Sequence, residues 1–121
     1  MPRSAALSPD GIRVAHICDA IDEALSFAEG KTKEDLATSR MLVLALFKEL
    51  EMIGEAASKI SEAFRRKHAE IPWDAMIATR NRLVHGYFDV DVEIVWKTIS
   101  EDLPRLIEDL RRVGTSSTAR P

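Results

Sequence analysis

The chain has little of several residue types on which common protein chemistries depend. Its 121 residues include one cysteine, one tyrosine, five glycines and five prolines. A single cysteine excludes an internal disulfide and favours a reducing cytosol, and Cys18 fits a small buried apolar residue better than a nucleophile. There is no glycine-rich phosphate loop, no Cys/His metal spacing, no internal repeat and no strand-like alternation. We therefore expect no metal and no cofactor.

Long apolar stretches are also missing. The most apolar run, Met41–Phe47, is far shorter than a membrane span. The N-terminus lacks the basic region followed by an apolar one that marks a signal peptide. We therefore expect a cytoplasmic protein with no membrane contact.

The net charge is low and unevenly distributed. It is −3, whereas a domain that coats DNA is usually strongly basic. Residues 59–85 are rich in Lys and Arg, while residues 89–109 carry seven acids against Lys97 and Arg105. A basic region beside an acidic one could admit a polyanion at one place. Two solvated helix faces would give the same pattern.

The spacing of the apolar residues predicts helices. Apolar residues recur at steps of three and four, which predicts a helix from Pro9 to Gly30, a short one after Thr32 and a long one from Ser39 to His68, about 45 Å in length. Further helices are predicted from Pro72 to Gly86 and from a cap at Asp89 or Asp91 to Val113. In the last one, Pro104 should bend the helix or begin a new turn.

These elements predict the fold class. We expect an all-α, up-down bundle of about four to five helices with a long central helix. A single domain should cover residues 1–113, and residues 114–121 should form a disordered tail. The nearly all-apolar start of the central helix, Met41–Phe47, favours contact with more than one neighbour, and a second subunit is a candidate.

Gly54 lies in the middle of the predicted central helix. It costs about 1 kcal/mol relative to alanine there, so we expect another helix to approach closely at this point. Glu51 and Glu55 lie one turn apart on either side of it. They could form a metal-binding pair, but no histidine accompanies them at a matching spacing.

The stretch from Arg80 to Tyr87 holds the chemistry of the chain. Arginine is a fork-shaped donor suited to phosphate, and histidine exchanges protons near neutrality. On one straight helix Arg80 and His85 would point about 140° apart. They can act on one atom only if the helix end unwinds at Gly86 or if two copies of the chain pair.

Such a set suits cleavage of RNA by its own 2′-hydroxyl. Histidine can remove the hydroxyl proton or protonate the leaving oxygen, and arginine can stabilise the charge on the phosphate. However, an arginine and a histidine at this spacing also arise by chance. The arginine can then pair with a carboxylate while the histidine simply ends a helix.

Several ordered motifs carry a family resemblance. They are Glu51-Met52-Ile53-Gly54-Glu55-Ala56-Ala57, Ile71-Pro72-Trp73, Arg80-Asn81-Arg82-Leu83-Val84-His85-Gly86-Tyr87, Glu93-Ile94-Val95-Trp96 and Glu101-Asp102-Leu103-Pro104. With them the segment from Leu50 to Leu110 closely resembles the HepT-like toxins of the HEPN superfamily. The resemblance implies an all-helical, homodimeric toxin of a toxin-antitoxin system that cleaves RNA without a metal.

The same resemblance assigns roles by position. Arg80 and His85 would be catalytic within an R-x4-H-x-Tyr motif, and Asn81 would support them. Tyr87 would accept AMP from a cognate minimal nucleotidyltransferase antitoxin, which would silence the enzyme. The implied partners are RNA, a second copy of the chain and the antitoxin, with the stoichiometry of any larger assembly left open. Two alternatives stay open, namely an inactive helical partner of a nucleotidyltransferase and a structural dimerisation domain.

Overall fold

The computed structural model describes residues 8–85 and 89–119, which form an all-α fold with one short pair of strands. The all-α class predicted from the sequence is confirmed. No helix among the described residues is long and apolar enough to cross a membrane. In chain order the elements are α2 (Pro9–Ala28), α3 (Lys33–Thr38), α4 (Arg40–Ser58), α5 (Glu62–Lys67), α6 (Trp73–Arg82), β1 (Val84–His85), β2 (Asp89–Val90), α7 (Val92–Lys97), a π-helical turn η1 (Thr98–Asp102) and α8 (Leu103–Ala119).

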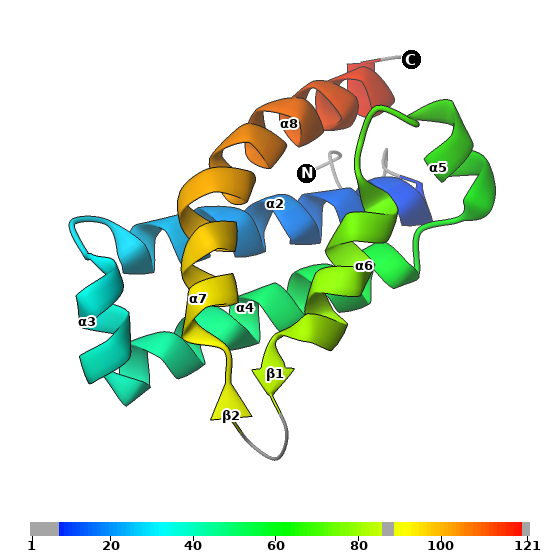
Figure 1. Ribbon diagram of the computed structural model, residues 1–121. Coiled ribbons are helices and arrows are strands. Elements are labelled where there is room, and N and C mark those ends of the chain that lie inside the picture. Colours follow the sequence, from blue (N-terminus) through cyan, green and yellow to red (C-terminus); the bar gives the residue numbers. More distant parts are fainter. Residues whose placement is uncertain (1–7, 86–88, 120–121) are drawn as a thin grey trace.

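Two long helices, α2 and α4, lie side by side and form the base of the bundle (Figure 1). Helix α8 lies along α2, and α6 packs across α4. Helix α7 contacts α3 and α4. The strand pair follows α6 directly and projects from the end of that helix at the edge of the bundle.

The first two helices begin and end at local sequence signals. Ser8 caps α2, because its Oγ accepts a hydrogen bond from the backbone N–H of Gly11 at 3.0 Å. Gly30, with φ at 75°, follows the end of α2, as predicted. Thr32 and Asp35 form a capping box at the start of α3, which confirms the short helix expected there.

The predicted central helix from Ser39 to His68 is wrong in its extent. Helix α4 ends at Ser58 after 19 residues. Ser61 then caps the separate helix α5 by accepting a hydrogen bond from the N–H of Phe64 at 3.1 Å. Because Ile60 between the two helices is also buried, the apolar spacing continues through the corner and conceals it.

Arg65 holds this corner together. Its side chain donates to the backbone carbonyl oxygens of Ala57, Ser58 and Ile60, each at 3.2 Å. These carbonyls belong to the end of α4 and the turn after it, where helical partners are missing. Arg65 therefore supplies the C-terminal cap that the sequence did not reveal.

The last helical segment changes its winding before Pro104. Asp91 caps α7 by accepting from the N–H of Ile94 at 3.2 Å. In η1 the N–H of Leu103 donates to the carbonyl oxygen of Thr98, five residues earlier. A new α-helix begins at Leu103, as expected next to a proline. This helix, α8, continues to Ala119 and so extends past Val113, after which the sequence predicts a disordered tail.

The core is formed by the apolar stripes that the sequence predicts. The stripe residues of α2 are between 0% and 1% exposed, and those of α4 and the last helices are similarly buried. They are Val14, Ile17, Ile21 and Ala24 from α2, Leu46, Leu50, Ile53 and Ala57 from α4, and Val95, Ile99, Leu103, Leu106 and Leu110 from the last segment.

Candidate active site

Arg80 lies where α6 crosses α4 at Gly54. A Cβ atom added to Gly54 would lie 2.9 Å from the Cβ of Arg80 and 3.2 Å from the carbonyl oxygen of Met76. Because Cβ atoms in proteins essentially never come within 3.0 Å of another atom in this way, only glycine permits the crossing. The predicted close approach at Gly54 is confirmed, and the approaching helix is the one that carries Arg80.

The guanidinium of Arg80 is held by Glu55, the residue after Gly54. Nη1 of Arg80 donates to Oε1 of Glu55 at 2.8 Å, and the two side chains are 29% and 56% exposed. Oε2 of Glu55 lies 3.4 Å from Nζ of Lys59, so one carboxylate pairs with two cations. Since guanidinium has five N–H donors, this arrangement orients Arg80 and leaves donors for an anion.

The helix that carries Arg80 ends earlier than predicted. Helix α6 stops at Arg82, not at Gly86, and residue Leu83 is its C-cap. The carbonyl oxygen of Leu83 accepts from the N–H of Asp91 at 2.7 Å. In addition, Val84 enters an antiparallel pair with β2. These backbone bonds replace the helical ones, so the chain becomes extended directly after α6.

His85 therefore does not lie on the same helix as Arg80. It belongs to β1, in register with Asp89 of β2. The angle of about 140° expected between Arg80 and His85 on one helix does not apply, because the helix unwinds between them. Asn81 lies exposed on the last turn of α6, and Tyr87 lies outside the described residues.

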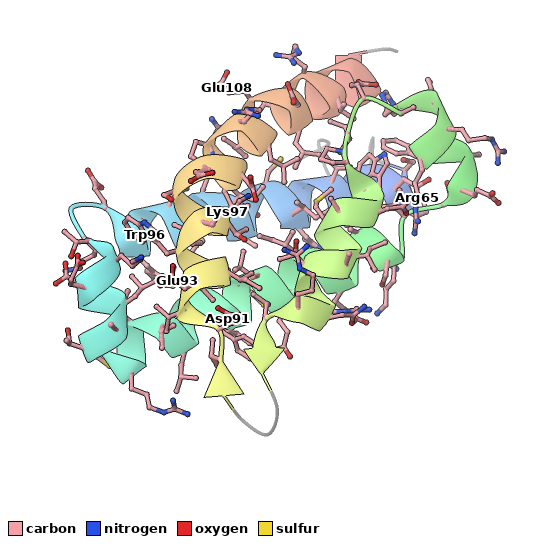
Figure 2. The ribbon with its side chains drawn as sticks, viewed as in Figure 1. Arg65, Asp91, Glu93, Trp96, Lys97 and Glu108 are labelled. Atoms are coloured by element: carbon pink, nitrogen blue, oxygen red, sulfur yellow. The ribbon has the colours of Figure 1, made fainter. Side chains whose placement is uncertain are left out.

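Both ends of the strand pair are anchored in the bundle. Leu83 at the start is fully buried. Asp91 at the end, labelled in Figure 2 where β2 leads into α7, caps α7. The segment between Arg80 and His85 is therefore fixed to α4 through Gly54 and to α7 through Asp91. Its position follows from packing across the chain and not from local helix geometry.

Arg80 also lines an open groove of about 710 Å³ between α2 and α4. Five acids and four permanent cations lie in its wall, so the groove of a single chain is not a basic track for nucleic acid. The charged residues are Arg13, His16, Asp19 and Glu23 from α2, Lys48, Glu49, Glu51, Glu55 and Lys59 from α4, and Arg80 from α6.

Two acidic residues of α4 have roles that the sequence analysis missed. The sequence suggests for Glu55 only a place in a metal-binding pair with Glu51, and it suggests no role for Glu49. The available signal for Glu55 was its place beside a mid-helix glycine, where a crossing helix had to bring side chains close. The burial of Glu49 on α4 had no signal in the sequence, because its neighbours in space come from another helix.

Two other expectations concern nucleophiles and metals. Burial raises the pKa of the Cys18 thiol to about 11, with Asp22 adding to the effect, so the thiol is protonated at neutral pH and a poor nucleophile. Within residues 8–85 and 89–119, no group of three or more histidine, cysteine or acidic side chains could hold a metal ion.

The sequence profile of the family described as ribonuclease HepT-like matches residues 17–113 of this chain. The chain belongs to the ribonuclease HepT-like family. A protein of Thermococcus cleftensis named "Probable ribonuclease HepT" is 40% identical over 99 residues, which cover 79% of this chain and 90% of that protein. No solved structure matches the chain significantly.

More distant relatives of this HepT-like chain have similar names. "Putative RNase TTE0752" of Caldanaerobacter subterraneus subsp. tengcongensis is 32% identical over 98 residues, covering 81% of this chain and 88% of its own. "Putative RNase MJ1380" of Methanocaldococcus jannaschii is 31% identical over 97 residues, covering 80% and 89%. The match to the HepT-like family includes Arg80, Asn81 and His85.

Proposed function

We propose that this protein is a metal-independent RNA endonuclease that acts as a homodimer and serves as the toxin of a toxin-antitoxin system. Arg80 and His85 are its catalytic residues, and Asn81 orients the phosphate through its amide. The observation that carries the proposal is that α6 ends between Arg80 and His85 while Glu55 fixes Arg80. Membership of the ribonuclease HepT-like family supports the same reaction class.

The reaction uses the 2′-hydroxyl of the RNA as its nucleophile. The 2′-oxygen forms a bond to phosphorus while the bond from phosphorus to the 5′-oxygen breaks, which gives a 2′,3′-cyclic phosphate and a free 5′-hydroxyl. One imidazole of His85 takes the proton of the 2′-hydroxyl, and the imidazole of the second copy protonates the leaving oxygen. The guanidinium of Arg80 stabilises the negative charge on the phosphate in the transition state.

The homodimer has support from exposed apolar side chains on α4. Met41 is 82% exposed, and Leu44 and Met52 are 39% and 40% exposed. Two copies that cover Met41 and Leu44 would provide two Arg80 and two His85 side chains, hence both an acid and a base. An isologous pair supplies both from one sequence.

Silencing is proposed to act at Tyr87. Transfer of AMP to its hydroxyl by a cognate minimal nucleotidyltransferase adds bulk and a phosphodiester charge two residues from His85. The RNA phosphate would then meet both a steric block and like-charge repulsion. A Tyr87→Phe variant should remove AMP transfer while RNA cleavage by the variant continues.

Growth on induced expression tests the toxin function. Wild type should arrest growth, and both Arg80→Ala and His85→Ala should permit it at equal protein levels with unchanged helical circular dichroism. Equal growth arrest by wild type and His85→Ala would contradict the proposal. If no form arrests growth or cleaves RNA while Tyr87 still accepts AMP, the chain is instead an inactive partner of the nucleotidyltransferase.

A further inference from the structure

Glu49 is buried in the wall of the groove between α2 and α4. The residue is 4% exposed, and its Oε1 is the one buried side-chain nitrogen or oxygen atom of the described residues that has no hydrogen-bond partner. A buried carboxylate oxygen without a donor is unfavourable, so it needs an explanation. Because Glu49 lines an open groove, a group from outside the chain can approach its carboxyl group.

Glu23 of α2 lies against Glu49 across this groove. Burial raises the pKa of Glu49 to about 7, and the hydrogen bond with Glu23 and the charge of Glu23 act in the same direction. Glu49 therefore keeps its proton up to about neutral pH, which is the state expected of a buried carboxyl group without a counter-ion.

The cations of the groove are engaged elsewhere or out of reach. Lys48 lies 3.8 Å from Glu51, while Lys59 and Arg80 both pair with Glu55. Arg13 precedes Glu23 by ten residues on α2, or about 15 Å along the helix axis. In the part of the chain that the structure describes, no salt bridge joins a cation to Glu23 or Glu49.

The surroundings favour an organic cation over a metal ion. Calcium takes six to eight oxygen ligands, and magnesium demands six in near-ideal geometry, but the pair offers two carboxyl groups. An ammonium or guanidinium group has only hydrogen-bond donors, which Oε1 of Glu49 requires. The adjacent groove wall includes Ala20, Met52 and Ala56, and Met52 is 40% exposed, so an alkyl chain attached to the cation would find apolar contact.

We propose that Glu23 and Glu49 form a binding site for an alkylammonium or alkylguanidinium group, with Met52 contacting the alkyl chain. The cation enters through the open side of the groove and donates to Oε1 of Glu49. Where Glu49 is protonated, the cation takes the place of that proton, so one proton leaves to solvent for each cation bound. Arg80 lines the same groove, but Glu23 and Glu49 have no role in the proposed cleavage of RNA, so this binding proposal does not depend on it.

This exchange makes binding dependent on pH. Below the pKa of Glu49, affinity for the cation should increase by up to about tenfold for each unit by which the pH is raised, because the cation competes with one proton. His16, Asp19, Glu51 and Glu55 line the same groove. The effect of Glu49 on the pH dependence of affinity is therefore measured as the difference between wild type and a Glu49→Gln variant, in which His16 is unchanged.

Isothermal titration calorimetry with spermidine tests the site. Wild type at pH 8 should bind spermidine at one site. At pH 6, below the pKa of about 7 for Glu49, binding should be weaker, and release of protons should appear as a dependence of the heat on the buffer. Glu49→Gln and Glu23→Gln should each weaken binding at least tenfold. Glu108→Gln is the matched control, because Glu108 is an exposed carboxylate on α8, away from the groove (Figure 2), and its binding should equal that of wild type.

A second arm identifies the source of the cation. If spermidine binds and the mass of the protein in solution does not change, the ligand is a free cation. If spermidine binds weakly but Glu49→Gln and Glu23→Gln weaken self-association, the cation is a lysine or arginine side chain of a second copy. Spermidine binding that is equal in wild type and both variants, together with equal self-association, would overturn the proposal.

Discussion

Nη1 of Arg80 lies 2.8 Å from Oε1 of Glu55, and the backbone of the preceding residue, Gly54, lies against the stem of the same arginine. Two consecutive residues of α4 thus determine the place and the direction of the guanidinium. The helix that carries Arg80 is held by contact with a glycine, and its charged end by a carboxylate. The proposed catalytic arginine therefore depends on α4 as much as on its own helix.

Glu55→Gln should lower RNA cleavage through a loss of orientation of Arg80. The amide keeps the shape of the side chain but loses the charge-assisted hydrogen bond. We expect kcat to fall about tenfold, which is on the order of 1.4 kcal/mol in the barrier, with unchanged helical circular dichroism. Glu51→Gln, one turn earlier and paired with Lys48, is the matched control and should cleave like wild type. Equal rates in both variants would argue against a positioning role for Glu55.

Gly54→Ala should destabilise the protein although alanine favours helix. The propensity gain is about 1 kcal/mol, but the new Cβ would overlap with Arg80 and push α6 away, at a cost of about 1–3 kcal/mol or more. Urea denaturation should show a net loss of stability, and RNA cleavage should fall with it. Gly30→Ala is the control, since Gly30 has a positive φ and open space around it. The Gly30→Ala variant should lose stability only through backbone strain and should retain RNA cleavage.

Stability should fall between about pH 5 and pH 8 because of Glu49. Its pKa is raised from 4.5 to about 7 in the folded protein, so the folded state holds a proton that the unfolded state has lost in this range. Unfolding free energy therefore decreases as pH rises, by about 1–3 kcal/mol for a shift of this size. Urea denaturation at a series of pH values should show this decrease in wild type and a smaller one in Glu49→Gln. Parallel curves would show that Glu49 titrates normally.

The corner between α4 and α5 should depend on Arg65. Arg65→Met keeps the aliphatic stem and removes three hydrogen bonds to backbone carbonyls, for a loss of about 1–3 kcal/mol. Arg66→Met removes an exposed ion pair with Glu62 one turn away and should cost less than about 0.5 kcal/mol. Equal losses in chemical denaturation would mean that Arg65 acts only as a surface charge.

The sequence predicted the features that depend on spacing along the chain. The caps at Ser8 and Thr32, the buried stripes and the close approach at Gly54 follow from local signals, and all are present in the structure. The break after Ser58 was missed because Ile60 continues the apolar spacing through it. Its cause is the cap by Arg65, which reaches back to the preceding helix.

Contacts between distant parts of the chain also determine the features of the candidate site that the sequence does not predict. The sequence identified Arg80, Asn81 and His85, and it required the helix end to unwind or two copies to pair, but it placed the helix end at Gly86. Helix α6 ends at Arg82 because the N–H of Asp91 donates to the carbonyl oxygen of Leu83 and because β1 pairs with β2. The spacing of apolar residues along the chain does not report such contacts. The partnership of Arg80 with Glu55 joins residues 25 positions apart, so it emerges only when the helices are packed.

Cleavage of a defined RNA in EDTA by wild type and His85→Ala tests the central claim most directly. Purified wild type, free of any partner, should convert the RNA to fragments that end in a 2′,3′-cyclic phosphate. His85→Ala, with the same helical circular dichroism, should be slower by at least about 10²-fold, the lower range for loss of a general acid–base. Cleavage by His85→Ala at the wild-type rate, or intact RNA with folded wild type across a panel of tRNAs and mRNAs, would contradict the account.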